Sequence, residues 1–185
     1  EAEAEGLHAL ATAEAIRVPA VRGLGATTTQ AFLALEWIEF VTATPQTEAS
    51  LGEQLARLHR VTANRFGWHR DNTIGAIPQH NAWTADWVEF FARHRLHFQL
   101  DLAERSGHGG SWLEQGRRLC DRLGVFFAGY APQPSLLHGD LWGGNWATDV
   151  SGEPVVFDPA VYFGDREADI AMTRLFGGFG PAFYE

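Results

Sequence analysis

Three oxygen-bearing side chains stand close together in the last third of the chain. Asp140 lies in the segment 138–145, which reads His-Gly-Asp-Leu-Trp-Gly-Gly-Asn; Asn145 closes that segment, and Asp158 follows a short apolar run. Transfer of a γ-phosphoryl group depends on positioning and on neutralising charge around the phosphate oxygens. A carboxylate and an amide oxygen suit magnesium, which binds few protein ligands beside phosphate and water. The set therefore indicates phosphoryl transfer, with Asp140 as the base toward an acceptor hydroxyl.

The spacing of these residues resembles the protein-kinase pattern H-R-D-x-x-x-x-N followed by a further Asp on a short strand. Asp140 takes the place of the base, and Asn145 and Asp158 take those of the magnesium ligands. Ser151-Gly152 separates two short apolar runs between them, which predicts a β-hairpin that brings Asn145 and Asp158 together. We expect His138 to orient the loop by hydrogen bonding rather than to titrate.

Length and composition indicate one compact globular unit. Its 23 acidic and 14 basic residues give a formal net charge of −9, and the basic residues are scattered, so nucleic acid and anionic membranes are not expected partners. No apolar run has the length of a membrane span and the N-terminus lacks signal-peptide character, which favours a cytoplasmic protein. All 14 basic residues are arginine, although kinases of this type use a lysine to hold ATP phosphates.

Periodic patterns predict the elements that must position the reactive set. The predicted helices have apolar residues at helical spacing and cover residues 1–15, a stretch from Thr47, 84–105, 111–129 and 166–176, the last capped by Asp165. The predicted strands cover 31–38, 135–137, 146–147 and 155–158. The nearly continuous apolar run 31–38 predicts a strand buried on both faces. An ordered surface loop is expected over 66–81.

Apolar side chains on the two long helices are expected in the protein core. They are Trp83, Trp87, Phe90, Phe91, Phe98, Trp112, Leu119, Leu123 and Phe126. The single cysteine, Cys120, is expected to be a buried structural thiol.

Several segments match more than the general kinase pattern. They are residues 2–7, 66–68, 71–72, 74–75, 79–81, 87, 90–91, 138–145, 158–160, 164–172 and 176–179. Together they resemble the fructosamine kinase (ketosamine-3-kinase) family along essentially the whole chain. The resemblance implies an α+β, protein-kinase-like fold of two lobes. Residues 1–38 would be a remnant of the N-lobe, and residues 39–185 the helical C-lobe with its catalytic loop and metal-binding hairpin.

The activity implied by the resemblance is ATP-dependent phosphorylation of the 3-hydroxyl of the sugar moiety of fructosamines and other ketosamines. The substrates would be small or protein-bound glycated amines, which the reaction deglycates, and the cofactors ATP and Mg²⁺. By the resemblance Asp140 is the base, and Asn145 and Asp158 are the magnesium ligands.

Further site residues are implied by the same resemblance. Glu3 would pair with the ATP-binding lysine, and Glu36, Trp37 and Ile38 would form the hinge that contacts adenine. Trp142 is the candidate apolar platform for the sugar.

Two aspartates near the last predicted helix have a structural interpretation. Asp165 and Asp169 are expected to hold the following loop and helix together rather than to touch substrate.

Two other functions remain open. A phosphotransferase of the aminoglycoside or choline type shares the Asp, Asn and Asp arrangement, but Trp142 and the segment 164–172 argue against it. A noncatalytic pseudokinase or binding module fits the absence of lysine. The intact Asp140, Asn145 and Asp158 argue against that alternative, because a protein that only binds has no need of all three.

The glycine-rich loop and the lysine strand of the family have no counterpart in these residues, so we expect the chain to be part of a longer kinase. We therefore predict little or no kinase activity for the 185 residues alone, because the phosphates of ATP would lack both groups. An ATP-consumption assay with a ketosamine acceptor checks this, and normal turnover by this chain would contradict it.

Overall fold

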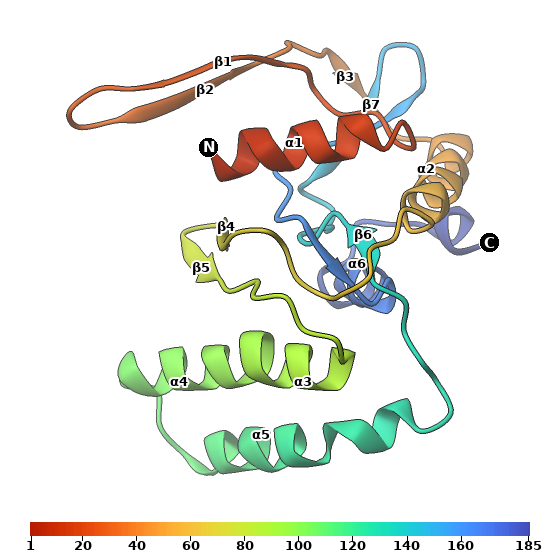
Figure 1. Cartoon of the computed structure of the whole chain (residues 1–185). Coiled ribbons are helices and arrows are strands. Elements are labelled where there is room, and N and C mark those ends of the chain that lie inside the picture. Colours follow the sequence, from red (N-terminus) through yellow and green to blue (C-terminus); the bar gives the residue numbers. More distant parts are fainter.

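The computed structural model describes residues 1–185 and shows a mixed α/β fold of helices and small sheets (Figure 1). The α-helices are α1 (Ala2–Thr12), α2 (Pro45–Leu58), α3 (Trp87–Phe91), α4 (Phe98–Arg105), α5 (Ser111–Arg122) and α6 (Glu167–Phe176). A π-helical segment, η1 (Ala92–His97), joins α3 to α4, and two 3₁₀ segments are η2 (Leu123–Phe127) and η3 (Pro181–Tyr184). The strands are β1 (Val21–Ala26), β2 (Ala31–Leu35), β3 (Phe40–Val41), β4 (Asn72–Ile74), β5 (Ile77–Gln79), β6 (Ser135–Leu137), β7 (Trp146–Asp149), β8 (Pro154–Val156) and β9 (Tyr162–Gly164).

Every strand pair is antiparallel. The sheet β3-β7-β8 has three strands, and β1-β2, β4-β5 and β6-β9 are two-stranded. The β7-β8 hairpin predicted from the sequence is confirmed, with Trp146 paired with Val156. Strand β6 runs into the segment 138–145 and β8 runs into Asp158, so these two short strands deliver the reactive set.

The main hydrophobic core joins α1, α2 and the strands around the segment 138–145. Its twelve buried residues are Leu10, Ala15, Ile16, Leu51, Leu55, Leu58, Leu136, Leu141, Trp146, Val156, Val161 and Phe183. Because Leu141 directly follows Asp140 and Trp146 directly follows Asn145, each of these two polar residues is next to a side chain anchored in the core. A second cluster of five, Phe66, Trp87, Phe90, Leu137 and Tyr162, packs α3 against β6 and β9.

Helix starts follow the capping signals of the sequence. Helix α2 begins at Pro45, slightly before the expected Thr47, because Thr44 is its N-cap and accepts a hydrogen bond from the Thr47 N–H at 3.2 Å. The helix predicted over 84–105 is confirmed from Trp87 onward, as Asp86 caps α3. The helix predicted over 111–129 is α-helical only to Arg122 and then narrows to 3₁₀ geometry.

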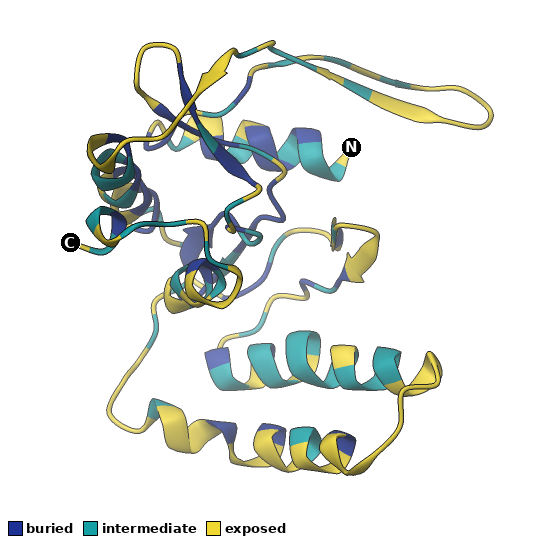
Figure 2. Ribbon diagram, turned by 180° about the vertical axis from the view of Figure 1, so that it is seen from behind, coloured by how far each residue is buried: buried dark blue, intermediate teal, exposed yellow.

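The strand predicted over 31–38 is wrong in length and in burial. Strand β2 ends at Leu35 and pairs only with β1, and the β1-β2 hairpin projects from the body of the molecule (Figures 1 and 2). Phe32 is 60% exposed and Trp37 is 88% exposed. An apolar strand is buried on both faces only if other elements pack against both faces, and the apolar run does not show whether they do.

The expectation that the apolar side chains of the long helices lie in the core is correct for only some of them. Trp87, Phe90 and Leu123 are buried, as is Cys120. Four of the side chains that were expected in the core are instead exposed: Trp83, Trp112, Leu119 and Phe126. Helix α5 packs on the α3–α4 run along one side, and its outer face is exposed (Figure 2).

The segment 66–81 is ordered as predicted, but it also contains the β4-β5 hairpin, which was not predicted. Apolar residues flank Gly75 and Ala76 in the sequence Ile-Gly-Ala-Ile, which is a short hairpin signal. No helix in the structure has both the length and the apolar character needed to cross a membrane.

The contact of α2 with η3 supports a test of the fold. A Cβ added at Gly52 would lie 2.3 Å from the carbonyl oxygen of Phe183. Alanine normally stabilises a helix relative to glycine, but here we expect Gly52→Ala to lower the free energy of unfolding by about 1–3 kcal/mol through overpacking. Urea unfolding measures this. Gly124→Ala is the control, since a Cβ there meets nothing within 4 Å; equal stability of the two variants would contradict the packing.

Candidate active site

The reactive residues predicted from the sequence line one cavity of about 380 Å³. Asp140, Asn145 and Asp158 lie there with Trp142, and Glu3 from α1 lies on the same wall. The structure therefore brings together five of the residues named from the sequence. It adds four more lining residues, which are Thr73, Gly75, Pro159 and Ala160.

Asn145 joins the loop to the hairpin. Its side-chain amide donates to the Asp140 backbone oxygen at 2.8 Å and to the Asp140 carboxylate at 3.1 Å. Its backbone oxygen accepts from the Phe157 N–H at 3.0 Å. Because Asp158 is the next residue after Phe157, this bond places Asp158 beside Asn145. Because the NH₂ group faces Asp140, the Oδ1 atom of Asn145 remains available as a ligand. Asp158 has a φ of +54°, a conformation that Asp tolerates better than most residues.

The His138 side chain connects the loop 138–145 to Phe157, the residue that follows β8. Its Nε2 lies 3.0 Å from the Phe157 carbonyl oxygen, and its Nδ1 accepts from the Asp140 N–H at 3.3 Å. Complete burial lowers the pKa of His138, against the opposing charge of Asp169, so the neutral ring with the proton on Nε2 fits both bonds. The prediction that His138 orients the loop by hydrogen bonding is confirmed.

The buried carboxylate of Asp169 holds the start of the same loop. It accepts the backbone N–H groups of His138 and Gly139, both at 2.9 Å, and its Oδ2 lies 3.0 Å from His59 Nε2. Burial by itself would raise the pKa of Asp169, but the hydrogen bond and charge of His59, together with the hydrogen bond from the Gly139 N–H, outweigh it and lower this pKa. Asp165 accepts from the Glu167 N–H and the Tyr130 hydroxyl. Asp165 and Asp169 thus make the structural contacts expected of them.

Gly139 is the position of the loop where an added side chain would meet the closest backbone contact. Its φ is +83°, and a Cβ there would lie 2.0 Å from the Ala160 carbonyl oxygen. Ala160 also donates its N–H to the His138 oxygen at 2.9 Å. The loop 138–145 and the segment after Asp158 are thus in direct backbone contact.

Negative charge accumulates in the cavity. Burial raises the pKa of Asp140, with the charge of Asp158 adding to the effect, although the hydrogen bond from Asn145 opposes it. Burial and the charge of Asp158 also raise the pKa of Glu3. Crowded carboxylates of this kind are relieved by a cation.

The donor set fits a magnesium ion of the type that is shared with phosphate. The free Oδ1 of Asn145 and the carboxylate of Asp158 are hard oxygen ligands in one cavity. No group of three or more His, Cys, Asp or Glu residues in the structure forms a metal site by itself. The remaining ligands of such an ion would therefore be phosphate and water oxygens.

The predicted hinge residues line a second, more apolar cavity of about 630 Å³ that shares Asp158 with the first. The Glu36 side chain accepts from the Ala20 N–H at 3.1 Å and pairs with Arg17, and the Ala20 bond is the main reason that the pKa of Glu36 is lowered. That carboxylate is engaged within the chain. The backbone oxygen of Glu36 and the N–H of Ile38 make no hydrogen bond within the chain and border the cavity.

Several residues around the site were given no role by sequence reasoning. Asn72, Gly75, Gln79 and Asn81 lie in segments that resemble the family, but their contacts were not predicted. Thr73 in β4, the buried His59, and Arg95 were not singled out at all. Only the hairpin had a local signal. The others are defined by contacts between segments far apart in the chain.

The fold and the site together define a protein-kinase-like phosphotransferase architecture. The chain superposes on an aminoglycoside phosphotransferase with a TM-score of 0.53 and 18% identity, over 91% of this chain and 59% of that one, a likeness of fold alone. The chain belongs to the fructosamine kinase family, because the family model for fructosamine kinase matches residues 1–185. The family resemblance and the fold class expected from the sequence are confirmed.

Similar proteins support this assignment. A putative fructosamine-3-kinase from Haemophilus somnus has a TM-score of 0.89 and 32% identity, covering 99% of this chain and 61% of that one. A probable ketoamine kinase from Synechocystis is 45% identical over 100% of this chain and 62% of its own length. A chloroplastic protein-ribulosamine 3-kinase from Oryza sativa is 42% identical over 100% of this chain and 54% of its own. The chain thus spans less than two thirds of these relatives.

Asp169 gives a test with a definite pH dependence. Its pKa is lowered in the folded state, so its stabilising effect is complete above its unfolded value, near 3.8, and is lost as the pH falls through the folded pKa. We expect Asp169→Asn to cost about 3 kcal/mol at neutral pH, because one amide N–H group must face N–H donors. Urea unfolding across this range should show the difference from wild type shrinking below pH 3.8. A difference that is independent of pH would contradict the ionic interaction.

Proposed function

We propose that this chain is the acceptor- and metal-binding part of an ATP-dependent kinase that phosphorylates the 3-hydroxyl of the sugar moiety of ketosamines. The observation that carries the proposal is the convergence of Asp140, Asn145 and Asp158 in one cavity of a chain from the fructosamine kinase family. The names of the relatives, ketoamine kinase and protein-ribulosamine 3-kinase, give the substrate class. The substrates would be small or protein-bound glycated amines.

Asp140 is the group that removes the proton of the acceptor hydroxyl. Its carboxylate is held by the Asn145 amide, and burial raises its pKa, which makes it a better proton acceptor. Asn145 Oδ1 and Asp158 are the protein ligands for Mg²⁺, which neutralises the phosphate oxygens when bound. Trp142, 42% exposed on the same cavity, offers its ring to the apolar face of the sugar.

The cavity along residues 36–38 is the proposed adenine site. The free backbone oxygen of Glu36 would accept from the amino group on the adenine edge, and the N–H of Ile38 would donate to a ring nitrogen on that edge. Trp37 lies between these two residues in the sequence. Glu3 would pair with the ATP-binding lysine of the longer protein, which supplies the cation that the Glu3 and Asp158 carboxylates lack here. In this proposal residues 1–38 belong to the N-lobe and 39–185 to the C-lobe, and the protein works in the cytoplasm.

The test uses the full-length protein. We expect ATP-dependent phosphorylation of fructosyl- and ribulosyl-lysine, and we expect Asp140→Asn to lower kcat about 10²- to 10⁴-fold, because the general base is lost. Phosphorus NMR of the product locates the phosphate, and a coupled ADP assay gives the rate. The matched control is Asp121→Asn on the exposed face of α5, which should keep the wild-type rate.

An acceptor screen with aminoglycosides and choline distinguishes the alternatives. Turnover of choline or an aminoglycoside without turnover of ketosamines would contradict the proposed substrate. ATP binding without any phosphoryl transfer by the full-length protein would favour a noncatalytic module.

A further inference from the structure

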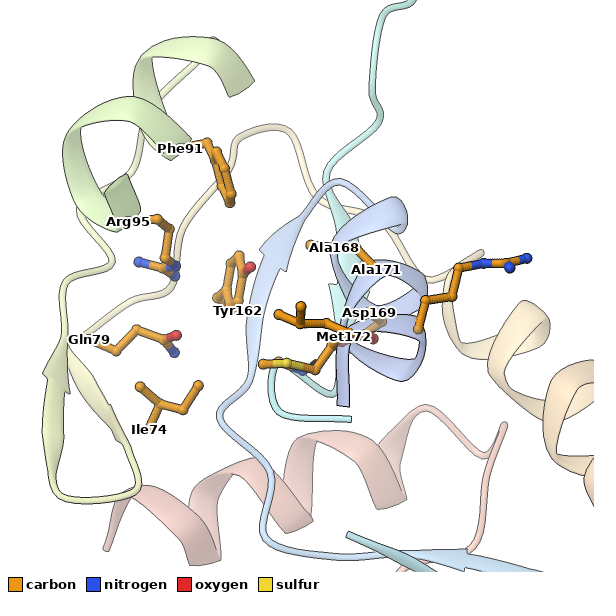
Figure 3. A pocket seen from close by; sticks show the side chains of 12 residues that line it. Ile74, Gln79, Phe91, Arg95, Tyr162, Ala168, Asp169, Ala171 and Met172 are labelled. Atoms are coloured by element: carbon orange, nitrogen blue, oxygen red, sulfur yellow. Dashed lines mark hydrogen bonds between the residues drawn. The ribbon is translucent and has the colours of Figure 1, made fainter. Parts of the chain in front are cut away.

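The β4-β5 hairpin lies at the edge of the candidate site. Thr73 and Gly75 line the cavity that holds Asp140 and Trp142. Ile74, between them, lines a neighbouring cavity of about 610 Å³ with Tyr162 and Met172 (Figure 3). Successive residues of a strand point to opposite faces, so the hairpin forms a wall with Thr73 on the side of the reactive residues.

Buried amides fasten this wall to the segment after Asp158. The Asn72 side chain donates to the Val161 oxygen at 2.8 Å. The Gln79 side chain donates to the Ala160 oxygen at 3.0 Å and to Asn72 Oδ1 at 2.9 Å. Asn72 and Gln79 are also directly paired in the two strands. The position of the hairpin is therefore set by the backbone that carries Asp158.

A second group of bonds fixes the hairpin from the helical side. The Asn81 side chain donates to Asn72 Oδ1 at 2.8 Å. The Arg95 guanidinium donates to Asn81 Oδ1 at 2.8 Å and to the His80 oxygen at 2.6 Å, and it stacks 4.1 Å from the centre of the Tyr162 ring. Figure 3 shows Arg95 between its helix and Tyr162. Arg95 has no carboxylate partner in the structure, so its charge serves this network.

The residues that anchor the hairpin are buried, whereas Thr73 is exposed, and this difference in burial indicates a function for the hairpin. A two-stranded hairpin is marginally stable alone, and the buried hydrogen bonds of Asn72, Gln79 and Asn81 hold this one in place. Asn72, Gln79 and Asn81 are buried, whereas Thr73 is exposed and its hydroxyl has no hydrogen-bond partner within the chain. The anchored hairpin thus places the unbonded Thr73 hydroxyl at the cavity that holds Asp140.

We propose that the β4-β5 hairpin is the acceptor-recognition element and that the Thr73 hydroxyl hydrogen-bonds a hydroxyl of the ketose, which makes Thr73 a determinant of acceptor affinity. The proposal rests on the proposed function and names a residue for its acceptor side. A ketose carries several hydroxyls on a short carbon chain. With its apolar face on Trp142 and one hydroxyl at Asp140, a further hydroxyl is left for the hairpin.

The test is Thr73→Val in the full-length protein, which removes the hydroxyl and keeps the shape and the strand preference. Loss of one hydrogen bond should raise KM for fructosyl- or ribulosyl-lysine about three- to tenfold. KM for ATP and the melting temperature should stay at wild-type values. Thr73→Ser should restore the acceptor KM, because it restores the hydroxyl.

The matched control is Thr28→Val, in the exposed turn of the β1-β2 hairpin, which should leave both KM values unchanged. Wild-type acceptor KM in Thr73→Val would overturn the inference while the proposed function stands. A parallel rise in KM for ATP would also overturn it, because it would show a general disturbance of the site. A wild-type protein that phosphorylates no ketosamine would overturn the proposed function and this inference together.

Discussion

The buried carboxylate of Asp169 is the interaction from which the site is built. It collects two backbone N–H groups at the start of the 138–145 loop and is itself paired with His59. Unpaired N–H groups at this depth would be costly, and an unpaired carboxylate more so, so each side of the contact depends on the other. These bonds fix the backbone where the loop follows β6, and Asp140, the next residue, lines the cavity.

From that fixed loop the rest of the site follows by short bonds. His138 reaches the hairpin strand at Phe157, Asn145 ties the hairpin to Asp140, and Ala160 packs on Gly139. The buried amides of the β4-β5 hairpin then use the carbonyls of Ala160 and Val161. Each step is a backbone contact or a buried polar bond, which explains how acidic groups that repel one another are held together in the cavity.

Much of the site was predictable because its pattern is local. The Asp, Asn and Asp spacing and the turn at Ser151-Gly152 are contained in residues 138–158, and a hairpin that joins them needs no knowledge of distant contacts. The prediction of a doubly buried strand over 31–38 was wrong for the opposite reason, since burial depends on which elements cover a strand. The exposed Trp112 and Phe126 show the same limit: helical spacing identifies an apolar face but not what lies against it.

The sequence by itself determined which candidate residues share the cavity around Asp140, the hairpin that unites them and the family to which the chain belongs, because these rest on residue types at short, fixed spacing. The tertiary structure alone decided that Asp169 and His59 support the loop, that Arg95 and three amides fasten the β4-β5 hairpin, and that Thr73 faces the cavity. Those contacts join segments far apart in the chain. Their geometry follows from how helices and strands pack, which no local pattern records.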